Sequence, residues 1–314
     1  MSSALLSRHP QHGRPPVDLG IVTISYNVRD LLRDNLRSVL ASQGVGTIEV
    51  VVVDNASHDG SAEMVKAEFP EVQLIANAHN AGFASAVNQG IAATHARHIL
   101  LLNPDMRLEL ETLARTIAYA DRVQTDRVAV IGAKLKTLDG EVVHTVRRFP
   151  DLLSQLLIIF KIPHLFPRLP ALTRYHADDF DYTKEQDVDS VRGSYFVITE
   201  AARAVLGVLD SHYFIWFEEV DYCKQAITKG WKVRYAPEIE AIDFVGRSFG
   251  QVTRLWAQIQ FTRSMAQYFE KWHSVSEARV IRVARLIGIT LNWLVDRARS
   301  LRGKAIGFRP TASS

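Results

Sequence analysis

Residues 48–60 read IEVVVVDNASHDG, a short apolar run followed by a polar turn. A continuous apolar run of this length predicts a buried β-strand that ends at Asp54, because strands covered on both faces lack polar alternation. The same unit recurs, with amphipathic helices between the apolar runs. The predicted strands are 18–25, 48–54, 72–76, 98–102 and 128–132, and the predicted helices are 28–40, 61–69, 82–94 and 109–123. This alternation predicts an α/β fold with a doubly wound, mostly parallel sheet and helices on both faces.

The pattern changes after Phe149. Residues 151–172 are apolar but broken by prolines, which end helices and strands. Further along, the sequence predicts strand-like structure at 188–199, helices at 201–206 and 219–229, a short strand at 231–237, and helical structure from 248 to about 301 with a break near His273. We therefore divide the chain into a disordered lead-in (1–17), a large α/β domain (18–250) and a helical C-terminal extension (251–314).

Composition excludes several classes of protein. The net charge over 314 residues is only +3, which gives no general case for nucleic-acid binding. The single cysteine, Cys223, excludes an internal disulfide and suits a reducing compartment, so we expect a cytoplasmic protein. The N-terminal segment lacks the apolar core of a signal peptide, and no run reaches the ~18 apolar residues that span a bilayer.

Three polar clusters follow predicted strands. They are Ser25–Asn27, Asp54–Ser57 and Asn103–Asp105. In doubly wound sheets, ligands bind at the carboxyl ends of the strands, near a switch in strand order. All three clusters are therefore candidates for a binding site.

The two carboxylates in these clusters each allow two interpretations. Asp54 is costly to bury unless it is paired; it can accept from a nucleobase N–H or a ribose hydroxyl, or it can cap the following helix. Pro104 fixes the turn that holds Asp105 beyond its strand. A rigid carboxylate beside Asn103 suits a divalent cation bridging two phosphates, but Asn-Pro-Asp is also good material for a surface β-turn.

Two further segments carry chemistry. Residues 77–90 (NAHNAGFASAVNQG) are small and polar, and a helix N-terminus at Gly82–Phe83 favours an anionic group, although small residues also serve plain helix–sheet packing. Glu218, Glu219 and Asp221 crowd together after an aromatic run. Crowded carboxylates can raise one pKa and make a general base, or they can stabilise the first turn of a helix.

Taken in order, six segments resemble the inverting family-2 glycosyltransferases of GT-A fold, and in particular their bacterial rhamnosyltransferase-like branch. The segments are VTISYN, VVVDNASHDGS, NAHNAGFASAVNQGI, LLNPD, RGSYFVITEAA and FIWFEEVDYCKQAITKGWKVRYAP. The resemblance covers about residues 18–250, which would be the GT-A domain. It implies transfer of a sugar from a nucleoside-diphosphate sugar, such as dTDP-rhamnose or a UDP-sugar, to a hydroxyl of a glycan or lipid-linked acceptor in cell-surface polysaccharide synthesis.

The resemblance also implies roles for individual residues. Glu218 or Glu219, with Glu218 ranked slightly ahead, would be the catalytic base that deprotonates the acceptor hydroxyl. Thr23, Tyr26 and Asp54 would hold the nucleobase and ribose, and Arg192 and Gly193 would form the floor under the donor sugar. The full donor-binding set is Thr23, Ser25, Tyr26, Asn27, Asp54, Asn80, Gly82, Phe83, Asn88, Asn103, Arg192 and Gly193.

The metal site departs from the family pattern. The resemblance makes Asp105 the ligand of Mg²⁺ or Mn²⁺, as part of a degenerate DXD motif. Relatives often carry a histidine after the final strand, where this chain reads AIDFVGRS, so that Asp243 or Phe244 takes its place. Asp243 can serve as a substitute ligand. Alternatively, Arg247 neutralises the diphosphate directly.

Two segments allow a membrane interpretation. Residues 275–303 alternate apolar and basic side chains, and residues 151–172 are apolar. A basic amphipathic helix can lie on an anionic membrane surface, which would place the protein at the inner face of the plasma membrane beside a lipid-linked acceptor. The alternative is packing against the protein's own domain or against a second copy in a homodimer.

Two other functions compete with this one. An NAD(P)- or SAM-dependent enzyme also uses an α/β sheet, but it needs a glycine-rich turn after the first strand, where this chain has SYNVRD. The second alternative is a nucleotide-sugar-binding protein with reduced or lost catalysis. The three acids Asp105, Glu218 and Glu219 argue against that alternative, whereas the missing histidine argues for it.

Overall fold

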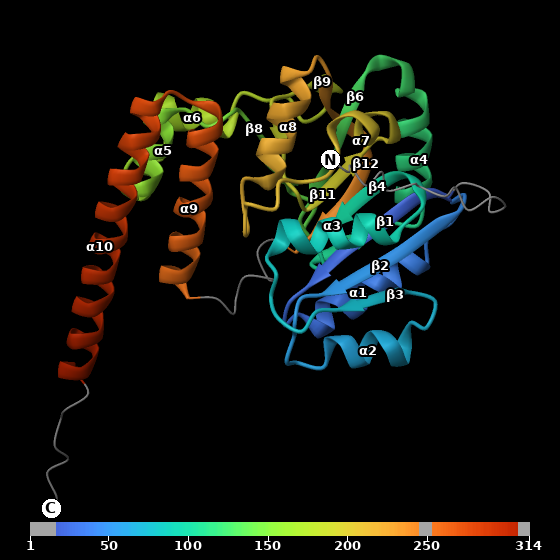
Figure 1. The fold of residues 1–314 in the computed structure, drawn as a ribbon, viewed down its shortest axis with the longest axis horizontal. Coiled ribbons are helices and arrows are strands. Elements are labelled where there is room, and N and C mark those ends of the chain that lie inside the picture. Colours follow the sequence, from blue (N-terminus) through green and yellow to red (C-terminus); the bar gives the residue numbers. More distant parts are fainter. Residues whose placement is uncertain (1–16, 245–252, 307–314) are drawn as a thin grey trace, which may run out of the picture.

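The computed structural model describes residues 17–244 and 253–306; within the last helix, the side chains of residue 292 and of residues 294–306 are not described. Its centre is a sheet with the strand order β3-β2-β1-β4-β11-β6-β12-β5 (Figure 1). The strands are β1 (Val17–Ser25), β2 (Ile48–Asp54), β3 (Gln73–Ala76), β4 (Ala96–Leu102), β5 (Met106–Leu108), β6 (Val128–Lys136), β11 (Tyr195–Ile198) and β12 (Lys232–Asp243). The short strands β7 (Val142–Val143) and β9 (Gln186–Asp187) pair with β6 and β12 of this sheet, and β8 (Val146–Arg147) pairs with β10 (Ser190–Val191) apart from it.

The sheet is mostly parallel. β3, β2, β1 and β4 run in one direction, and β6 pairs in parallel with β12. β11 lies between these two groups and runs antiparallel to both β4 and β6. The order of the first strands, in which the chain moves outward from β1 to β3 and then returns to β4, is the switch at which doubly wound sheets bind ligands.

Helices cover both faces of the sheet, as predicted. They are α1 (Arg29–Leu40), α2 (Ser61–Glu68), α3 (Phe83–Ala93), α4 (Thr112–Arg122), α7 (Glu200–Leu206) and α8 (Glu218–Thr228), with a 3-10 turn η1 (Gln124–Asp126). Alternate residues of β2 supply the two cores: Val50 and Val52 pack with α1, α2 and α4, whereas Val51 and Val53 pack with α3, α7 and α8. The run of four valines is therefore buried on both sides, which explains why it lacks polar alternation.

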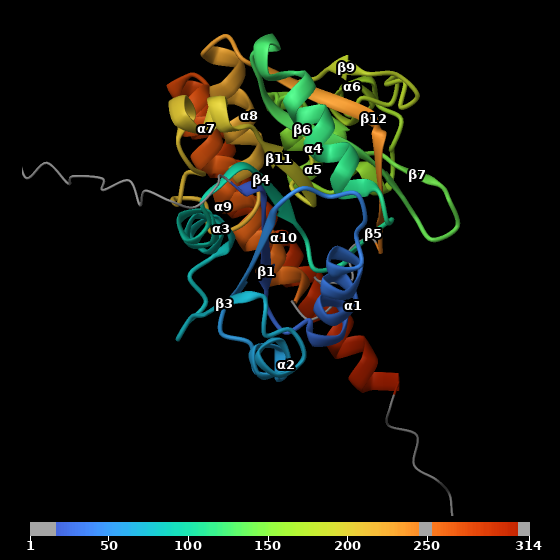
Figure 2. The same ribbon diagram turned by 90° about the vertical axis from the view of Figure 1, so that its right-hand side faces the viewer.

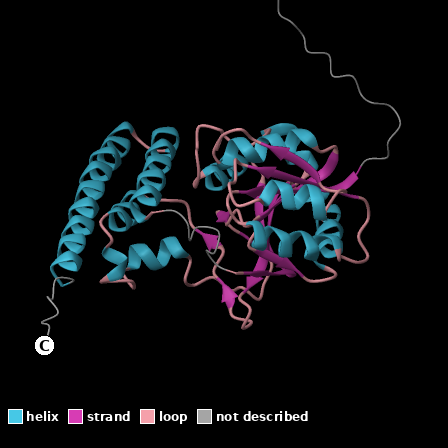
Figure 3. Cartoon of the chain, turned by 90° about the horizontal axis from the view of Figure 1, so that it is seen from below, coloured by secondary structure: helices cyan, strands magenta, loops and turns pink. Residues whose placement is uncertain are grey.

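A separate helical layer stands beside the sheet (Figures 1 and 3). It consists of α5 (Leu152–Ile159), η2 (Ile162–His164), α6 (Pro170–His176), α9 (Arg254–Trp272) and α10 (Val275–Ile306). A third apolar core, with residues such as Ile159, Met265 and Ile281, holds this layer together. Tyr213 and Phe217, which precede α8, belong to the same core. The helical layer is thus packed onto the segment that leads into α8.

The predicted fold class is confirmed, and the strand and helix predictions fail only in detail. The five predicted strands and four predicted helices of residues 18–132 are all present, and the helical C-terminal region breaks at His273 as expected. β5 was not predicted, because three residues give no periodicity. β12 extends to Asp243, beyond the predicted end at residue 237. Residues 151–172, which had no predicted structure, form helical pieces because prolines stand at the start of η2 and α6 rather than inside them.

Several predictions concern residues beyond those described. Residues 1–16, which make up nearly all of the predicted lead-in, and Arg247 and Ser248 lie outside the described residues. Val17, the last residue of that predicted lead-in, begins β1. None of the helices in the described ranges combines the length and hydrophobicity that a bilayer span requires.

Candidate active site

The carboxyl ends of β1 and β2 meet as predicted. Ser25 pairs with Asp54 in the parallel register, and Thr23, Ser25 and Asp54 are all buried. Asp54 Oδ1 accepts a hydrogen bond from the Ser57 amide at 2.9 Å, while Gly60 rather than Asp54 is the cap residue of α2. The Thr23 and Ser25 hydroxyls and Asp54 Oδ2 have no hydrogen-bond partner among the described residues. Since unpaired buried polar atoms are costly, these three groups at the edge of the sheet fit contacts to a ligand.

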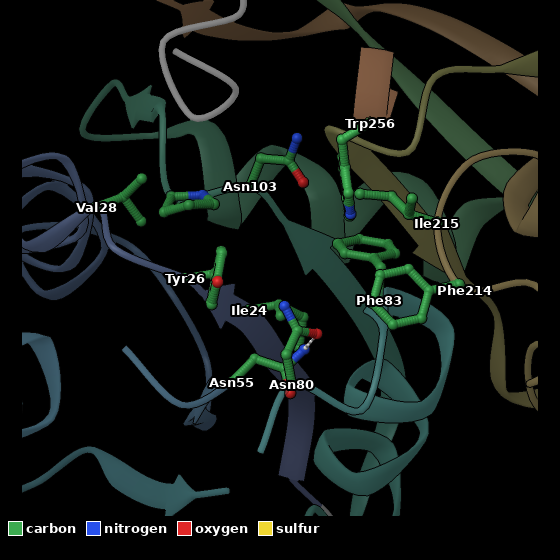
Figure 4. A pocket seen from close by; sticks show the side chains of 11 residues that line it. Ile24, Tyr26, Val28, Asn55, Asn80, Phe83, Asn103, Phe214, Ile215 and Trp256 are labelled. Carbon is green, nitrogen blue, oxygen red and sulfur yellow. Dashed lines mark hydrogen bonds between the residues drawn. The ribbon is translucent and has the colours of Figure 1, made fainter. Parts of the chain in front are cut away.

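A pocket opens at this edge of the sheet (Figure 4). Four residues predicted from sequence line it: Tyr26, Asn80, Phe83 and Asn103. The remaining lining residues are Ile24, Val28, Asn55, Pro104, Phe214, Ile215 and Trp256. The pocket combines aromatic rings with amide side chains, a lining that suits a planar ring bearing polar groups.

Asn55 organises one wall of the pocket. Its Nδ2 donates to Asn80 Oδ1 at 2.9 Å and to the Gly82 carbonyl at 3.2 Å, and its Oδ1 accepts from the Ala81 amide at 2.9 Å. Gly82 has a φ of 85°, and a Cβ atom there would lie 2.8 Å from the Phe214 carbonyl oxygen. Only glycine satisfies both constraints, so Gly82 shapes the pocket by letting the Phe214 segment approach.

Two predicted donor-binding residues instead hold loops in place. Asn27 donates its amide to Ser57 Oγ at 2.9 Å, and its Oδ1 accepts from the His58 amide at 2.7 Å. Asn88 bonds both ways to the backbone of Leu209, at 2.7 Å and 3.0 Å. Neither is among the described residues that line the pocket. The structure therefore gives both a scaffolding position.

Asp105 and Asp243 are neighbours in the backbone pairing, since Asp105 directly precedes β5 and Asp243 ends β12. Asp243 pairs with Met106 across β12 and β5, and the Phe244 amide donates to the Asp105 carbonyl at 3.0 Å. Both carboxylates are buried, each about 3% exposed. Asp105 lies in a hydrogen-bonded turn, since the Met106 amide donates to the Asn103 carbonyl at 3.2 Å. The β-turn allowed by the sequence is therefore present, but it is buried rather than on the surface.

Arg192 connects this pair of carboxylates to α8. Its Nη1 lies 3.6 Å from Asp243 Oδ2, and its charge acts on Glu219. The neighbouring Gly193 lies against Glu219, because a Cβ atom there would be 3.7 Å from Glu219 Cβ. The predicted sugar floor, Arg192 and Gly193, thus lies between Asp243 and Glu219.

Glu218 and Glu219 begin α8, and the backbone directly before them is strained. Trp216 and Phe217, the two residues before the helix, have φ angles of 64° and 72°. Consecutive left-handed residues with large aromatic side chains are costly, and such strain gathers at functional sites. Their rings pack on α9, and the Phe217 ring lies tilted against Phe261 and Tyr268, with centroids 5.4 and 5.6 Å away. Packing of the aromatic rings therefore holds the two glutamates in place.

The two glutamates differ in environment. Glu218 is 4% exposed, and burial, followed by the charge of Glu219, raises its pKa well above the ordinary value. Burial also raises the pKa of Glu219, but the charge of Arg192 opposes that effect. Glu218 Oε2 and Glu219 Oε2 have no hydrogen-bond partner among the described residues. The environment thus favours a proton on Glu218 and the charge on Glu219.

Asp221, the third acid of the cluster, has a different position. It is fully buried and accepts four hydrogen bonds. Its Oδ1 accepts from Tyr213 Oη at 3.2 Å and Trp272 Nε1 at 2.6 Å, and its Oδ2 accepts from Lys271 Nζ at 2.8 Å and Gln225 Nε2 at 2.9 Å. Sequence reasoning grouped Asp221 with the candidate base. In the structure it joins α8 to α9.

The donor set suits a hard divalent cation that is shared with a ligand. Asp105 and Asp243 supply carboxylate oxygens, the ligands that Mg²⁺ and Mn²⁺ prefer. No group of three or more His, Cys, Asp or Glu side chains that could hold a metal occurs in the described part of the chain. Two carboxylates with phosphate oxygens and water are a common way to bind Mg²⁺, so the residues present fit a cation held jointly with a diphosphate.

The family model for glycosyl transferase family 2 matches residues 20–174. The N-acetylglucosaminyl-diphospho-decaprenol L-rhamnosyltransferase of Mycobacterium tuberculosis is 26% identical over 247 residues, which are 74% of this chain and 78% of that relative. The rhamnosyltransferase WbbL of Escherichia coli is 26% identical over 184 residues, 57% of this chain and 65% of that relative. The chain belongs to the family-2 glycosyltransferases.

A solved structure agrees on the fold. A mannosyltransferase of Pyrobaculum calidifontis, in complex with GDP-Man and Mn²⁺, superposes with a TM-score of 0.55 at 15% sequence identity. The similarity covers 96% of this chain and 85% of that one. The α/β domain therefore has the GT-A fold, and the protein is a glycosyltransferase related to rhamnosyl and polysaccharide-biosynthesis transferases.

We predict that Lys271→Ala lowers the free energy of unfolding by about 3 kcal/mol, because it leaves the buried Asp221 carboxylate without its cation. Urea denaturation measures the change. Arg263→Ala is the matched control, since Arg263 is an exposed residue of the same helix. Equal stability of the two variants would show that the Asp221 network does not hold α9 to α8.

Proposed function

We propose that the protein transfers a sugar from a nucleoside-diphosphate sugar, dTDP-rhamnose or a UDP-sugar, to a hydroxyl of a glycan or lipid-linked acceptor with inversion. The observation that carries this proposal is the order of groups along one edge of the sheet. An aromatic and amide pocket, the pair Asp105 and Asp243, the cation Arg192 and the glutamate pair follow one another. The nucleobase, diphosphate and sugar of the donor, followed by the acceptor hydroxyl, would contact these groups in the same order.

The donor's base and ribose would occupy the pocket. Tyr26 and Phe83 offer ring faces for stacking, and Asn80 and Asn103 offer amide groups. Asp54 Oδ2, buried and without a partner among the described residues, would accept from a ribose hydroxyl or a base N–H. A thermal-shift panel of nucleotide sugars identifies the nucleotide, because a ligand that binds only the folded state raises the melting temperature.

Glu219 is the better candidate for the base. Ranking from sequence put Glu218 slightly ahead, but Glu218 is nearly inaccessible, whereas Glu219 is only partly buried and lies against Gly193. In the proposed step, Glu219 takes the proton of the acceptor hydroxyl while the hydroxyl oxygen attacks the anomeric carbon of the donor sugar. The bond between the anomeric carbon and the nucleoside diphosphate breaks on the opposite face. The nucleoside diphosphate leaves with the electron pair of that bond. Glu218, kept neutral by burial, would position its neighbour.

Asp105 and Asp243 would hold the cation. When bound, Mg²⁺ or Mn²⁺ would neutralise negative charge on the diphosphate leaving group. Arg192 would act on the same charge, since its Nη1 lies 3.6 Å from Asp243 Oδ2. Two cationic groups near the leaving diphosphate would lower the barrier to its departure.

The proposal for the acceptor and the location draws on the relatives. The mycobacterial relative is named for a lipid diphosphate that carries a sugar, N-acetylglucosaminyl-diphospho-decaprenol. We propose that this chain also takes a lipid-linked acceptor, for a cell-surface polysaccharide, at the inner face of the plasma membrane. Apolar side chains exposed on α10, including Val283 and Leu286 at 58% and 63%, would make peripheral contact there.

We predict that Glu219→Gln lowers the transfer rate about 10²–10⁴-fold, because the amide cannot accept the acceptor proton. The matched substitution Glu218→Gln should stay within about tenfold of the wild type. Transfer from the nucleotide sugar found in the thermal-shift panel measures both, and donor affinity should not change. Equal losses in the two variants would refute the assignment of the base, and a wild type that binds donor without transfer would mean that catalysis is lost.

We predict that Glu218→Gln becomes more stable than the wild type as pH rises. The raised pKa means that folded Glu218 keeps its proton above pH 4.5, where the unfolded chain has already released it. The folded state therefore loses stability relative to the unfolded state as pH rises through this interval. Melting temperatures from pH 4 to pH 9 check the prediction, and a difference between variant and wild type that does not depend on pH would contradict it.

A further inference from the structure

We propose that a groove in the helical layer binds the lipid diphosphate of the acceptor; this inference rests on the proposed function. The groove has a volume of about 1080 Å³, at the upper end of the range for sites that enclose whole ligands. It lies between the α5–η2 segment, the start of α9 and α10. Its lining is Ile158, Ile159, Phe160, Lys161, His164, Trp216, Arg254, Leu255, Ala257, Gln258, Phe261, Thr262 and Leu291.

The lining has the chemistry of an amphiphile with an anionic head. Most of it is aliphatic or aromatic, which suits a hydrocarbon chain. The charged side chains are Lys161 and Arg254, and His164 adds a group that can become cationic, while no carboxylate occurs among the described lining residues. Neither Lys161 nor Arg254 forms an ion pair with another described residue. Unpaired cations beside an apolar wall fit a diphosphate that is attached to a lipid.

A buried amide points to the same ligand. Gln258 lines the groove and is 6% exposed, and its Nε2 donates no hydrogen bond to any described residue. An unused buried donor is costly, so it fits contact with an acceptor atom supplied from outside. Gln258 lies one turn along α9 from Arg254, on the same side of the helix. A phosphate oxygen near Arg254 would satisfy the Gln258 amide.

The groove adjoins the proposed donor site. In the first turn of α9, Arg254, Leu255 and Ala257 line the groove, whereas Trp256 lines the donor pocket (Figure 4). The ring of Trp216, which also lines the groove, has its centroid 6.4 Å from that of Trp256. In the sequence, Trp216 stands two residues before Glu218. A sugar at the end of a lipid diphosphate in the groove would therefore lie beside the two glutamates.

The surface around the groove continues its apolar character. Phe160 and Leu291 are 37% and 49% exposed, and Leu165 and Phe166, which follow η2, are 73% and 59% exposed. A lipid chain longer than the groove would pass from it onto this surface and from there into a bilayer. An inorganic phosphate or a free nucleotide would gain nothing from these side chains. The apolar surroundings therefore select a lipid source for the anionic group.

Binding of farnesyl diphosphate to the full chain tests the proposal, with tryptophan fluorescence as the readout because Trp216 lines the groove. We expect saturable binding that is much weaker for pyrophosphate or farnesol alone. The double variant Lys161→Ala/Arg254→Ala should raise the dissociation constant at least tenfold, because each residue supplies a charge-assisted contact. Leu291→Asp should also weaken binding, and it changes a half-exposed side chain that folding does not require. Arg263→Ala, on α9 but not in the groove, is the matched control.

The outcomes separate this inference from the proposed function. Failure of farnesyl diphosphate to bind, or binding that none of the groove variants changes, overturns the groove assignment. If the groove assignment fails, transfer to a water-soluble sugar acceptor by the same groove variants would still support the proposed function. Groove binding without transfer to any acceptor would instead refute the proposed function alone. Self-association that the groove variants abolish, in the absence of lipid binding, would identify a second copy as the occupant and overturn the proposal.

Discussion

The candidate site depends on one buried carboxylate. Asp221 is fully buried, and each of its oxygens accepts two hydrogen bonds, from the segment before α8, from α8 itself and from two residues at the end of α9. A buried charge is stable only when its partners are complete, so these elements have one favourable arrangement. That arrangement holds the left-handed residues Trp216 and Phe217 and, directly after them, both glutamates. The helical layer is therefore part of the site rather than an appendage.

Much of the sheet edge could be predicted from the sequence, because it depends on local patterns. Apolar runs gave the strands, and the rule that parallel strands bind ligands at their carboxyl ends gave Asp54 and Asn103. Other parts depend on contacts between distant segments, which no local pattern records. Phe214 and Trp256 reach the pocket from beyond residue 200, and Asn55 acts only through residues that lie more than twenty positions away. Asp221 was grouped with its neighbours because sequence spacing does not show which side chains Lys271 and Trp272 meet.

The two cavities give the helical layer a role in the proposed reaction. The first turn of α9 presents Trp256 to the donor pocket and Arg254 to the groove, so the same turn of helix borders both cavities. The proposed base lies near this junction, because Trp216 contacts the groove lining just before α8 begins. A donor bound on the sheet and an acceptor bound on the helices would meet there. In this proposal, the sheet binds the nucleotide and the helices bind the acceptor.

The central claim is that Glu219 acts as the base in a single displacement, in which the acceptor hydroxyl replaces the nucleoside diphosphate on the donor sugar. The configuration of the product's anomeric carbon tests it most directly, by NMR of the product formed from the donor selected in the thermal-shift panel. The account predicts that the anomeric configuration is opposite to that of the donor, because the acceptor attacks the face opposite the departing diphosphate. A product with the donor's own configuration would contradict the account.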